Sequence, residues 1–530
     1  MTRSNELKRV AGALGAALLS LVAQADSSPD VAPVAQEVHA SALKPDWYRK
    51  GVFMEIYVRG YQDSNGDGKG DLKGLTQRLD YLQSLGITGL WLMPIFPSAD
   101  HDHGYAITNY RDIEPDYGTL ADFDAFLAAA HAHGMGVILD YVPNHSSAQH
   151  PLFKASDADP ASPYRDFYVW EADKPAGWQG FHGDPWHAGQ HGYYYGVFNG
   201  GMPDFNFRNP KVLDFHLDNL KFWLNRGVDG FRIDAAGVLV ENSRLEWENQ
   251  PENHQVLHQF RQLLDRYDNR YMVVEAPSAP AEFTAPESAG SAFAFGLQKQ
   301  IVASANQGRA LPGMLEYLAH YPVANMGTFL ANHDSFAGIR LYAAFDGDEP
   351  RYKQAITTLL TLPGIPFLYY GEEIGQGGSD PVKYDDQRQR GPMSWDASTG
   401  FTTADQPFRP YAGNRANHNV AREKAKPDSL LNTYRTLIHL RTTHPALSVG
   451  TLKVLSDKDA PILAFTREAG AEKLLVVINY SAAEHSWTPP AALQHARLKH
   501  IYPASGPADD ITKTIPLAPF ESAVFQIGER

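Results

Sequence analysis

Residues 230–234 read Gly-Phe-Arg-Ile-Asp, a short and largely apolar run that ends in a carboxylate. Residues 271–275 repeat the pattern as Tyr-Met-Val-Val-Glu. Around these runs lie stretches with helical spacing of apolar residues, such as 122–133 and 210–225, the second of which starts with proline. Short strands that alternate with helices indicate βαβ units and a parallel sheet.

The spacing of the strand-like runs indicates the type of sheet. A (β/α)₈ barrel of about 250 residues has about 31 residues per strand–helix unit. Ile56 and Trp91 lie 35 residues apart and Asp234 and Glu275 lie 41 apart, which fits one unit each, while Glu275 and Asp334 lie 59 apart, which fits two. We therefore predict an α/β fold, a (β/α)₈ TIM barrel, with strands at 52–58, 89–94, 137–141, 230–234, 271–275, near 293–297, 327–330 and 366–369.

One interval along the barrel is too long for a single unit. Asp140 and Asp234 lie 94 residues apart, about 60 more than a unit needs. The excess is rich in Gly, Pro and aromatic residues and lacks helical periodicity, so we predict a small domain, domain B, inserted after strand 3 at residues 144–202. The barrel then takes residues 47–143 and 203–440.

The two ends of the chain differ from the barrel. Residues 445–530 contain runs of alternating apolar and polar residues, which predict a C-terminal antiparallel β-sandwich domain. Residues 1–25 have a basic start, an apolar stretch and an Ala-Gln-Ala site at 23–25, the pattern of a signal peptide. The apolar stretch, 10–22, is shorter than the ~20 residues that span a bilayer, which argues against a membrane anchor. We expect residues 26–46 to be a linker and the protein to be exported, either periplasmic or secreted.

The composition excludes several classes of partner. The net charge of −15 repels phosphate backbones and anionic lipid, so we expect neither nucleic acid nor a membrane as partner. The chain has no cysteine, which excludes disulfides, thiol nucleophiles and thiolate metal sites. A neutral sugar is compatible with both observations, and we expect a monomer.

Three acidic residues follow predicted barrel strands at the end where active sites of such barrels lie: Asp234, Glu275 and Asp334. Any one of them taken alone is more typical of a helix N-cap or a loop carboxylate. Arg232 lies two residues before Asp234, so both side chains point to the same face of the strand, and we expect the arginine to keep Asp234 ionised. Glu275 follows three apolar residues, an environment that favours its protonated form. An ionised and a protonated carboxyl side by side are what retaining glycoside hydrolysis requires.

Five ordered segments carry a resemblance to a known family. They are Asp-Tyr-Val-Pro-Asn-His at 140–145, Met-Pro-Asp-Phe-Asn at 202–206, Gly-Phe-Arg-Ile-Asp-Ala at 230–235, Val-Glu-Ala at 274–276 and Asn-His-Asp at 332–334. Together they resemble the conserved segments of the α-amylase superfamily, glycoside hydrolase family 13, in its amylase and α-glucosidase-like members. The resemblance extends over about residues 47 to 530.

The resemblance implies roles for these residues. Asp234 would be the nucleophile, Glu275 the general acid/base, and Asp334 the residue that stabilises the transition state. Further sugar contacts would come from two loops: Asp102-His-Gly-Tyr105 holds and stacks on the sugar, and the arginine of Arg390-Gly-Pro-Met-Ser-Trp395 pairs with that aspartate. Each loop is also compatible with an ordinary turn. The expected substrate-binding residues are Asp102, Tyr105, His145, Arg232, His333 and Arg390.

The stretch 63–71 has the spacing of a calcium loop. Asp63, Asn65, Asp67, the backbone of Lys69 and Asp71 offer oxygens at positions 1, 3, 5, 7 and 9, with Gly at position 6. Position 12 is not Glu, so the loop is not an EF-hand, and a polar Gly-rich turn is the alternative. We expect a structural Ca²⁺ here, because three aspartates this close repel one another unless neutralised.

A second calcium site of many amylases, to which Asn144 belongs, also uses a Lys-His pair after the nucleophile. Here residues 235–238 read Ala-Ala-Gly-Val, which puts that site and the sugar contacts of the pair in doubt.

The expected function is retaining hydrolysis of α-1,4-glucosidic bonds in starch-derived glucans and maltooligosaccharides. Ala235 after the nucleophile resembles α-1,4-specific members. Two alternatives stay open. One is an exo-acting α-glucosidase or a transglucosylase such as a trehalose synthase, which the calcium loop and the Arg390 segment favour. The other is a non-catalytic sugar-binding relative, although such proteins usually lose at least one of the three acids.

Overall fold

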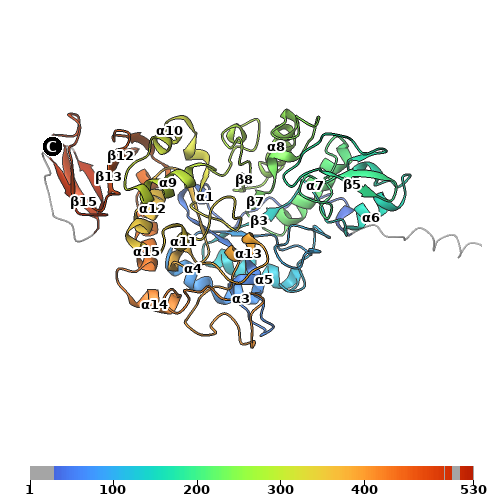
Figure 1. Cartoon of the computed structure of the whole chain (residues 1–530), viewed down its shortest axis with the longest axis horizontal. Coiled ribbons are helices and arrows are strands. Elements are labelled where there is room, and N and C mark those ends of the chain that lie inside the picture. Colours follow the sequence, from blue (N-terminus) through green and yellow to red (C-terminus); the bar gives the residue numbers. More distant parts are fainter. Residues whose placement is uncertain (1–28, 495, 504–513, 529–530) are drawn as a thin grey trace, which may run out of the picture.

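The computed structural model describes residues 29–494, 496–503 and 514–528. The barrel lies in the middle of the molecule, with the C-terminal β domain (red) at one end and the inserted domain (teal) at the other (Figure 1). The expected signal peptide, residues 1–25, lies outside the described residues. Within the described ranges no helix has the length and apolar character to cross a membrane.

Parallel strands form the barrel as expected. The strands are β1 (Phe53–Ile56), β2 (Gly89–Leu92), β3 (Gly136–Tyr141), β7 (Gly230–Ile233), β8 (Tyr271–Val274), β9 (Gly327–Thr328) and β10 (Ile365–Tyr369). They pair in the order β8-β7-β3-β2-β1-β10-β9. Single bridges from Ala292 to Val274 and from Phe293 to Gly327 join the two outer strands and close the ring. The expected sixth strand, 293–297, is therefore reduced to two bridging residues, Ala292 and Phe293. It begins one residue earlier than expected and is short because a helix already starts at Leu297.

Alternating side chains of the strands fill the barrel interior. Phe53 on β1, Trp91 on β2 and Ile138 on β3 belong to one buried cluster, while their neighbours, such as Met54, pack outward against the helices. Every residue of β1, β2 and β3 is buried. Burial on both faces explains why these strands are nearly continuous apolar runs in the sequence.

Helices surround the ring, and local capping residues determine where they begin. The helix expected at 122–133 runs from Leu120, because Thr119 and Asp122 form a capping box. The helix expected at 210–225 is confirmed, with Asn209 as N-cap and Pro210 as its first residue. The helices around the barrel, through to the junction with the C-terminal domain, are α1 (Trp47–Lys50), α2 (Val58–Tyr61), α3 (Leu72–Gln77), α4 (Leu79–Leu85), α5 (Leu120–Ala132), α7 (Pro210–Asn225), α8 (Pro251–Leu264), α9 (Leu297–Gln307), α10 (Pro312–His320), α11 (Leu341–Ala344), α12 (Glu349–Thr361), α13 (Asp385–Gln389), α14 (Val420–Ala425), α15 (Leu430–Thr443) and α16 (Pro445–Val449).

A small unit follows β3, where the insertion is expected. It holds helix α6 (Pro151–Ala158) and an antiparallel sheet in the order β4-β6-β5, with β4 (Trp170–Glu171), β5 (Trp186–Gly189) and β6 (Gly192–Tyr195). Trp186 and Tyr195 are 4% and 1% exposed and form its core. These aromatic residues therefore pack the unit and do not present a face to a sugar.

The C-terminal region consists of two antiparallel sheets. The larger has the order β11-β12-β13-β17-β15 and the smaller pairs β14 with β16. Ile462 and Leu475 from the first sheet pack against Ile515 and Leu517 from the second, which makes a sandwich core. The strands are β11 (Thr451–Val454), β12 (Ile462–Ala469), β13 (Glu472–Asn479), β14 (His485–Trp487), β15 (Arg497–Tyr502), β16 (Ile515–Leu517) and β17 (Ser522–Gly528).

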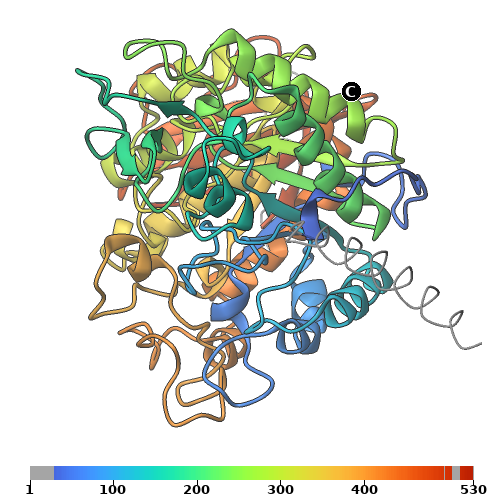
Figure 2. The ribbon, with the colours of Figure 1, turned by 90° about the vertical axis from the view of Figure 1, so that its right-hand side faces the viewer.

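The described part of the expected linker, residues 29–46, is fastened to the barrel and is not a free tether. Asp30 is fully buried, accepts a hydrogen bond from the backbone N–H of Tyr110 at 3.0 Å and contacts His150 Nε2 at 3.0 Å. Further along, Arg270 donates to the carbonyl of Ala40 at 2.9 Å. In Figure 2 this segment is the dark blue ribbon next to the green helices at the right of the molecule. A composition typical of linkers is thus also compatible with a segment that packs on the barrel and forms hydrogen bonds with it.

Candidate active site

The three acids meet at the carboxyl end of the barrel strands. Asp234 directly follows β7, Glu275 directly follows β8, and Asp334 follows β9 after a short loop. Asp234 and Glu275 are each 7% exposed, and the side chain of Asp334 is 18% exposed. Because β7 and β8 are neighbours in the ring, their last residues project toward the same space.

Arg232 on β7 holds the acidic cluster together. Its Nη1 donates to Asp234 Oδ1 at 2.5 Å and to Asp140 Oδ1 at 2.8 Å, and its Nη2 contacts Glu275 Oε2 at 2.8 Å. The contact with Asp234 follows from the two-residue spacing on one strand. A single buried guanidinium therefore connects three carboxyl groups from three adjacent strands.

The shared arginine changes the electrostatics expected for Asp234. Burial raises the pKa of Asp234 well above its ordinary value; Arg232 opposes this, and the charges of Glu275 and Asp140 add to the rise. The expectation that Arg232 keeps Asp234 ionised is wrong, because burial outweighs the charge of the guanidinium, which is divided among three acids. Burial likewise raises the pKa of Asp140 to about 6, against the opposing charge of Arg232. Asp234 and Asp140 therefore retain protons at a pH where exposed carboxylates have lost theirs.

Asp334 lies in a second network, which includes His333 and Arg390. Its carboxylate accepts a hydrogen bond from Arg390 Nη2 at 2.8 Å and lies 3.1 Å from His333 Nε2. Burial raises the pKa of Asp334 to about 7; Arg390 opposes the rise and Glu275 adds to it. The ring of His333 is neutral, since burial, followed by the charge of Arg390, lowers its pKa well below the ordinary value.

Tyr105 links the two networks. Its hydroxyl donates to Asp140 Oδ2 at 2.9 Å and lies 2.6 Å from His333 Nε2, with the two rings stacked at 5.5 Å. On the other side of the imidazole, Glu55 Oε1 lies 2.6 Å from His333 Nδ1. Protein groups therefore contact both nitrogens of the His333 ring and fix its orientation beside Asp334.

The loop aspartate Asp102 has a different partner from the one expected. Arg409 donates to Asp102 Oδ1 at 2.7 Å, the hydroxyl of Tyr57 donates to the same oxygen at 2.7 Å, and Gln387 donates to Oδ2 at 3.1 Å. Although burial acts against it, these donors lower the pKa of Asp102 to about 2. Arg390 instead pairs with Asp334. The predicted Arg390–Asp102 pair is thus wrong, because Arg409 comes from later in the same long loop and takes that position.

His145 lies beside the cluster, at the entrance to domain B. Its ring is 2% exposed and packs edge-on against Phe198, with centroids 5.1 Å apart. Burial lowers its pKa to about 3, although a hydrogen bond with the backbone of Tyr105 opposes the shift. His145 is therefore a neutral polar group in the same region as the other expected sugar contacts.

Sequence reasoning missed Glu55 and Arg409. Glu55 follows Phe53 by two residues on β1, so it faces the barrel interior, and a charged residue at an interior strand position was a usable signal. Arg409 had none, because it lies in an irregular stretch 307 residues from its partner Asp102.

The expected calcium loop forms one compact turn of polar groups. Asp63 Oδ1 accepts from the amides of Asn65 at 2.9 Å and Gly66 at 2.7 Å, and its Oδ2 accepts from Gly68 and from the hydroxyl of Thr402. Burial acts to raise the pKa of Asp63, but these hydrogen bonds outweigh it and the pKa is lowered.

The other charged residues of the loop are also partly satisfied by protein groups. Asp71 caps α3 and accepts from Ser64, and the ammonium of Lys69 pairs with Asp116 at 2.8 Å. Among the described residues, no group of three or more His, Asp or Glu is arranged to hold a metal ion. The donors are all oxygens, which suits a hard cation, but an ion here would depend on the Asn65 amide and the Lys69 carbonyl as much as on carboxylates.

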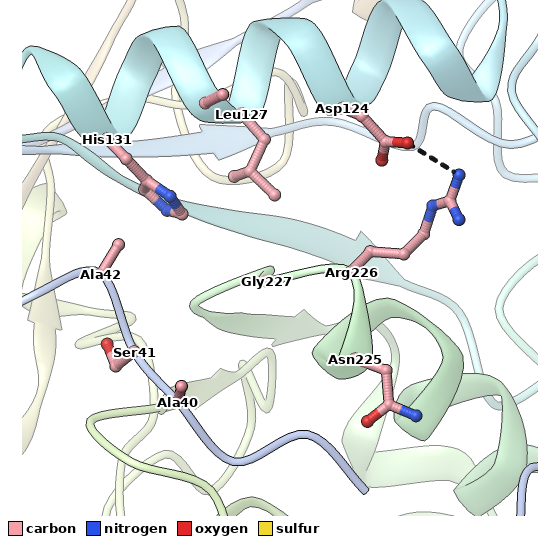
Figure 3. Close-up of a pocket in the computed structure, with 10 residues that line it drawn as sticks. Ala40, Ser41, Ala42, Asp124, Leu127, His131, Asn225, Arg226 and Gly227 are labelled. Carbon is pink, nitrogen blue, oxygen red and sulfur yellow. Dashed lines mark hydrogen bonds and ion pairs between the residues drawn. The ribbon is translucent and has the colours of Figure 1, made fainter. Parts of the chain in front are cut away.

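A cavity of about 540 Å³ lies away from the acids, between α5, the turn after α7 and residues 40–42 (Figure 3). Arg226 donates to Asp124 across its edge at 3.1 Å. Both α5 and this turn lead into the starts of barrel strands, so the cavity is at the opposite end of the barrel from the carboxylates.

The alpha-amylase catalytic domain family model matches residues 55–450. This chain belongs to the α-amylase family. It is 36% identical to Alpha-amylase 3 of Dictyoglomus thermophilum, over 83% of this chain and 87% of that protein. It is 33% identical to a trehalose synthase of Pimelobacter sp. strain R48, over 82% of this chain and 87% of that one. Its fold matches that of Bacillus licheniformis trehalose-6-phosphate hydrolase with a TM-score of 0.81 and 25% identity, over 92% of this chain and all of that one.

Membership of the α-amylase family agrees with the motifs and with the closed barrel. It makes this chain a glycosidase-family enzyme with a carbohydrate substrate. The relatives named differ in their reactions, so the family alone leaves the bond and the mode of attack open. In this α-amylase family member, Asp234 and Glu275 lie close together on one guanidinium, and two carboxyls close together are what a retaining glycosidase needs.

Proposed function

We propose that the protein hydrolyses α-1,4-glucosidic bonds in starch-derived glucans and maltooligosaccharides with retention of configuration. The observation that supports this most directly is that Asp234 and Glu275 contact the two nitrogens of one guanidinium, at 2.5 and 2.8 Å. Such closeness is compatible with the ~5–5.5 Å between carboxyls in retaining glycosidases and leaves little room for the water that inverting enzymes place between them.

The chemistry assigns one role to each acid. Asp234 attacks the anomeric carbon while Glu275 gives its proton to the departing oxygen, so one C–O bond breaks as another forms to Asp234. Glu275 then removes a proton from water, which attacks the same carbon and releases Asp234 as a carboxylate. Asp334, paired with Arg390, would hold sugar hydroxyls in the distorted transition state. The first step requires the proton on Glu275 and an ionised Asp234, and Arg232, which contacts both carboxyls, acts to lower the pKa of Asp234 against the larger effect of burial.

An exo-acting α-glucosidase or a transglucosylase is the second candidate. Arg409, Tyr57 and Gln387 hold Asp102 at the edge of the site, where a fixed charge closes the space around a chain end. The trehalose synthase relative points the same way.

Digestion of soluble starch and of a maltooligosaccharide blocked at its non-reducing end separates these candidates. Rapid loss of viscosity and cleavage of the blocked substrate support the endo-acting α-amylase. Activity restricted to free non-reducing ends, or transfer of glucose to another sugar, supports the second candidate. Proton NMR of the first product tests retention, and an initial β-anomer contradicts it.

A non-catalytic sugar-binding relative is the remaining alternative. All three acids are present and are brought into one site, which argues against it. Sugar binding without any hydrolysis by the wild-type protein would support it.

We also propose that the protein is exported, to the periplasm or the medium, and acts as a monomer. The support for export is the signal-like sequence at residues 1–25. N-terminal sequencing of the mature protein, fractionation of the producing cells and sedimentation analysis test the three statements separately.

The fixed Asp102 gives a prediction for substrate binding. We expect Asp102→Asn to lower kcat/KM for maltooligosaccharides by about 10- to 100-fold, because a charge-assisted hydrogen bond to the sugar is lost and Arg409 loses its partner. Steady-state kinetics on maltotriose measure the change. The matched control is Asp124→Asn, which removes an ion pair with Arg226 at the opposite end of the barrel from the acids. Equal losses in both variants would contradict the role of Asp102.

We propose a structural Ca²⁺ for the loop at 63–71, and its removal gives a second prediction. An ion that binds only the folded protein at 100 times its dissociation constant stabilises it by about 2.7 kcal/mol. We therefore expect Tm in saturating Ca²⁺ to exceed Tm in EDTA by about 2–4 °C in thermal unfolding. Asp67→Asn should remove the difference and Asp124→Asn should keep it. A wild-type Tm that is equal in Ca²⁺ and EDTA would show that the loop is a polar turn held by its own amides.

A further inference from the structure

The leaving side of the site can be located from the order of the strands. The group that protonates the departing oxygen faces the leaving sugar, so on the proposed function that sugar lies on the side of Glu275. β3, β7 and β8 are consecutive in the ring, and the loops after them form this half of the rim. Asp102 and Arg409 come from loops after β2 and β10, on the other half.

No Lys-His pair follows Asp234 to contact a leaving sugar, since residues 235–238 are Ala-Ala-Gly-Val. The leaving half of the rim instead carries a row of three aromatic rings, Phe198, Phe181 and Trp247. Phe198 packs against His145 at the catalytic cluster, with ring centroids 5.1 Å apart. Phe181 lies 5.3 Å from Phe198 and 5.2 Å from Trp247. The row thus leads outward from the acids.

Phe181 differs from the other aromatic residues of the inserted domain. Its side chain is 48% exposed, whereas Trp186 and Tyr195 nearby are buried in the core of that domain. A half-exposed phenyl ring that is supported on two sides by other rings offers a free apolar surface at a fixed place. The C–H groups of a sugar ring pack on such a surface without any need for charge.

The loop that carries Trp247 is tied to both catalytic strand ends. The amide of Asn249 donates to the carbonyl of Gly237, three residues after Asp234, at 2.6 Å. The side chain of Asn249 donates to Ser278 Oγ, three residues after Glu275, at 2.8 Å. Trp247 also packs against the cluster that contains Ala235 and Val238. Its ring is therefore positioned relative to the reacting groups and not only to the surface.

We propose that Phe181 and Trp247, with Phe198 behind them, form the platform that binds the sugar on the leaving side of the cleaved bond. In a transfer reaction the same platform would bind the accepting sugar. The inference rests on the proposed function and adds the residues that recognise the leaving part of the substrate. They are specificity residues, since they act on sugar rings away from the bond that reacts.

The test compares a substrate that fills the leaving side with one that does not. Maltoheptaose places sugars there, whereas α-glucosyl fluoride leaves only fluoride. We expect Phe181→Ala and Trp247→Ala each to lower kcat/KM for maltoheptaose by about 2- to 10-fold, and transfer to added maltose by a similar factor. Hydrolysis of α-glucosyl fluoride should stay within about twofold of wild type, since its reaction makes no use of the platform.

Two further variants make the result specific. Trp247→Phe keeps a ring in place and should recover most of the loss on maltoheptaose. Tyr321→Ala removes another exposed ring, 38% exposed and stacked on Tyr317, from the end of α10 that precedes β9, at the opposite end of the barrel, and should change neither substrate.

If Phe181→Ala and Trp247→Ala lose equal activity on both substrates, or lose none on maltoheptaose, the platform is overturned. The proposed function still stands in that case, provided that the wild-type protein is active. A wild-type protein inactive on both substrates would overturn the two together.

Discussion

Replacing Asp234 by Asn should lower kcat for maltooligosaccharides by roughly 10⁴-fold or more, because an amide cannot form the covalent intermediate. The shape of the side chain is kept, and Arg232 can still donate to the amide oxygen. Folding should therefore be intact, and binding of maltoheptaose to the variant should remain measurable by calorimetry. Undiminished hydrolysis would show that Asp234 is not the nucleophile.

The same variant should be more stable than the wild type at neutral pH. The pKa of Asp234 is raised in the folded protein by burial, against the opposing charge of Arg232. Below the unfolded pKa of about 3.9 the carboxyl is protonated in both states and contributes no pH dependence. As the pH rises above that value the unfolded chain ionises first, so the wild type loses stability until the pH passes the folded pKa, whereas Asn does not titrate.

The measurement is Tm at pH 4, 5.5 and 7 for both proteins. The difference in favour of Asp234→Asn should be near zero at pH 4 and grow toward pH 7. Asp124→Asn, which changes a half-exposed carboxylate in a surface ion pair, is the control and should show no such growth. A difference that is constant with pH, or that falls as the pH rises, would contradict the shifted pKa of Asp234.

The features of the site that the sequence predicts are those set by strand geometry. Arg232 and Asp234 are two residues apart on one strand, so their contact at 2.5 Å follows from the period of a β-strand. Asp234 and Glu275 converge because residues that follow neighbouring parallel strands meet at one end of a barrel. Both inferences need only local pattern and topology.

The features that the sequence could not predict depend on loops and on shared charge. Arg409 occupies the position assigned to Arg390, and nothing in a single sequence distinguishes two arginines of one irregular loop. The ionisation of Asp234 was predicted from its neighbour Arg232 alone. In the structure the positive charge of Arg232 is shared among three carboxyl groups. Asp30 shows the same limit at the chain end, since a composition typical of a linker does not reveal that this carboxylate is buried against His150.

Glu275→Gln should separate the two steps of the reaction. We expect kcat for maltooligosaccharides to fall by about 10²- to 10⁴-fold, because the departing oxygen of a sugar needs the proton that Glu275 supplies. α-Glucosyl fluoride should still form the intermediate on Asp234, since fluoride leaves without protonation. Its turnover should then stall, because no base remains to remove a proton from the attacking water. A burst of fluoride release followed by a slow phase is the expected record.

Added azide should restore the turnover of Glu275→Gln on α-glucosyl fluoride, because azide attacks the intermediate without a base. The intermediate on Asp234 has the β configuration, so attack from the opposite face gives α-glucosyl azide, and the anomer is read by NMR. β-Glucosyl azide would mean that the azide took the place of the nucleophile, and would exchange the roles of the two acids. Wild-type protein is the control and should show no acceleration. The structure places the two acids close enough for this test, since the backbone N–H of Ala235, the residue after Asp234, donates to Glu275 Oε2 at 3.2 Å.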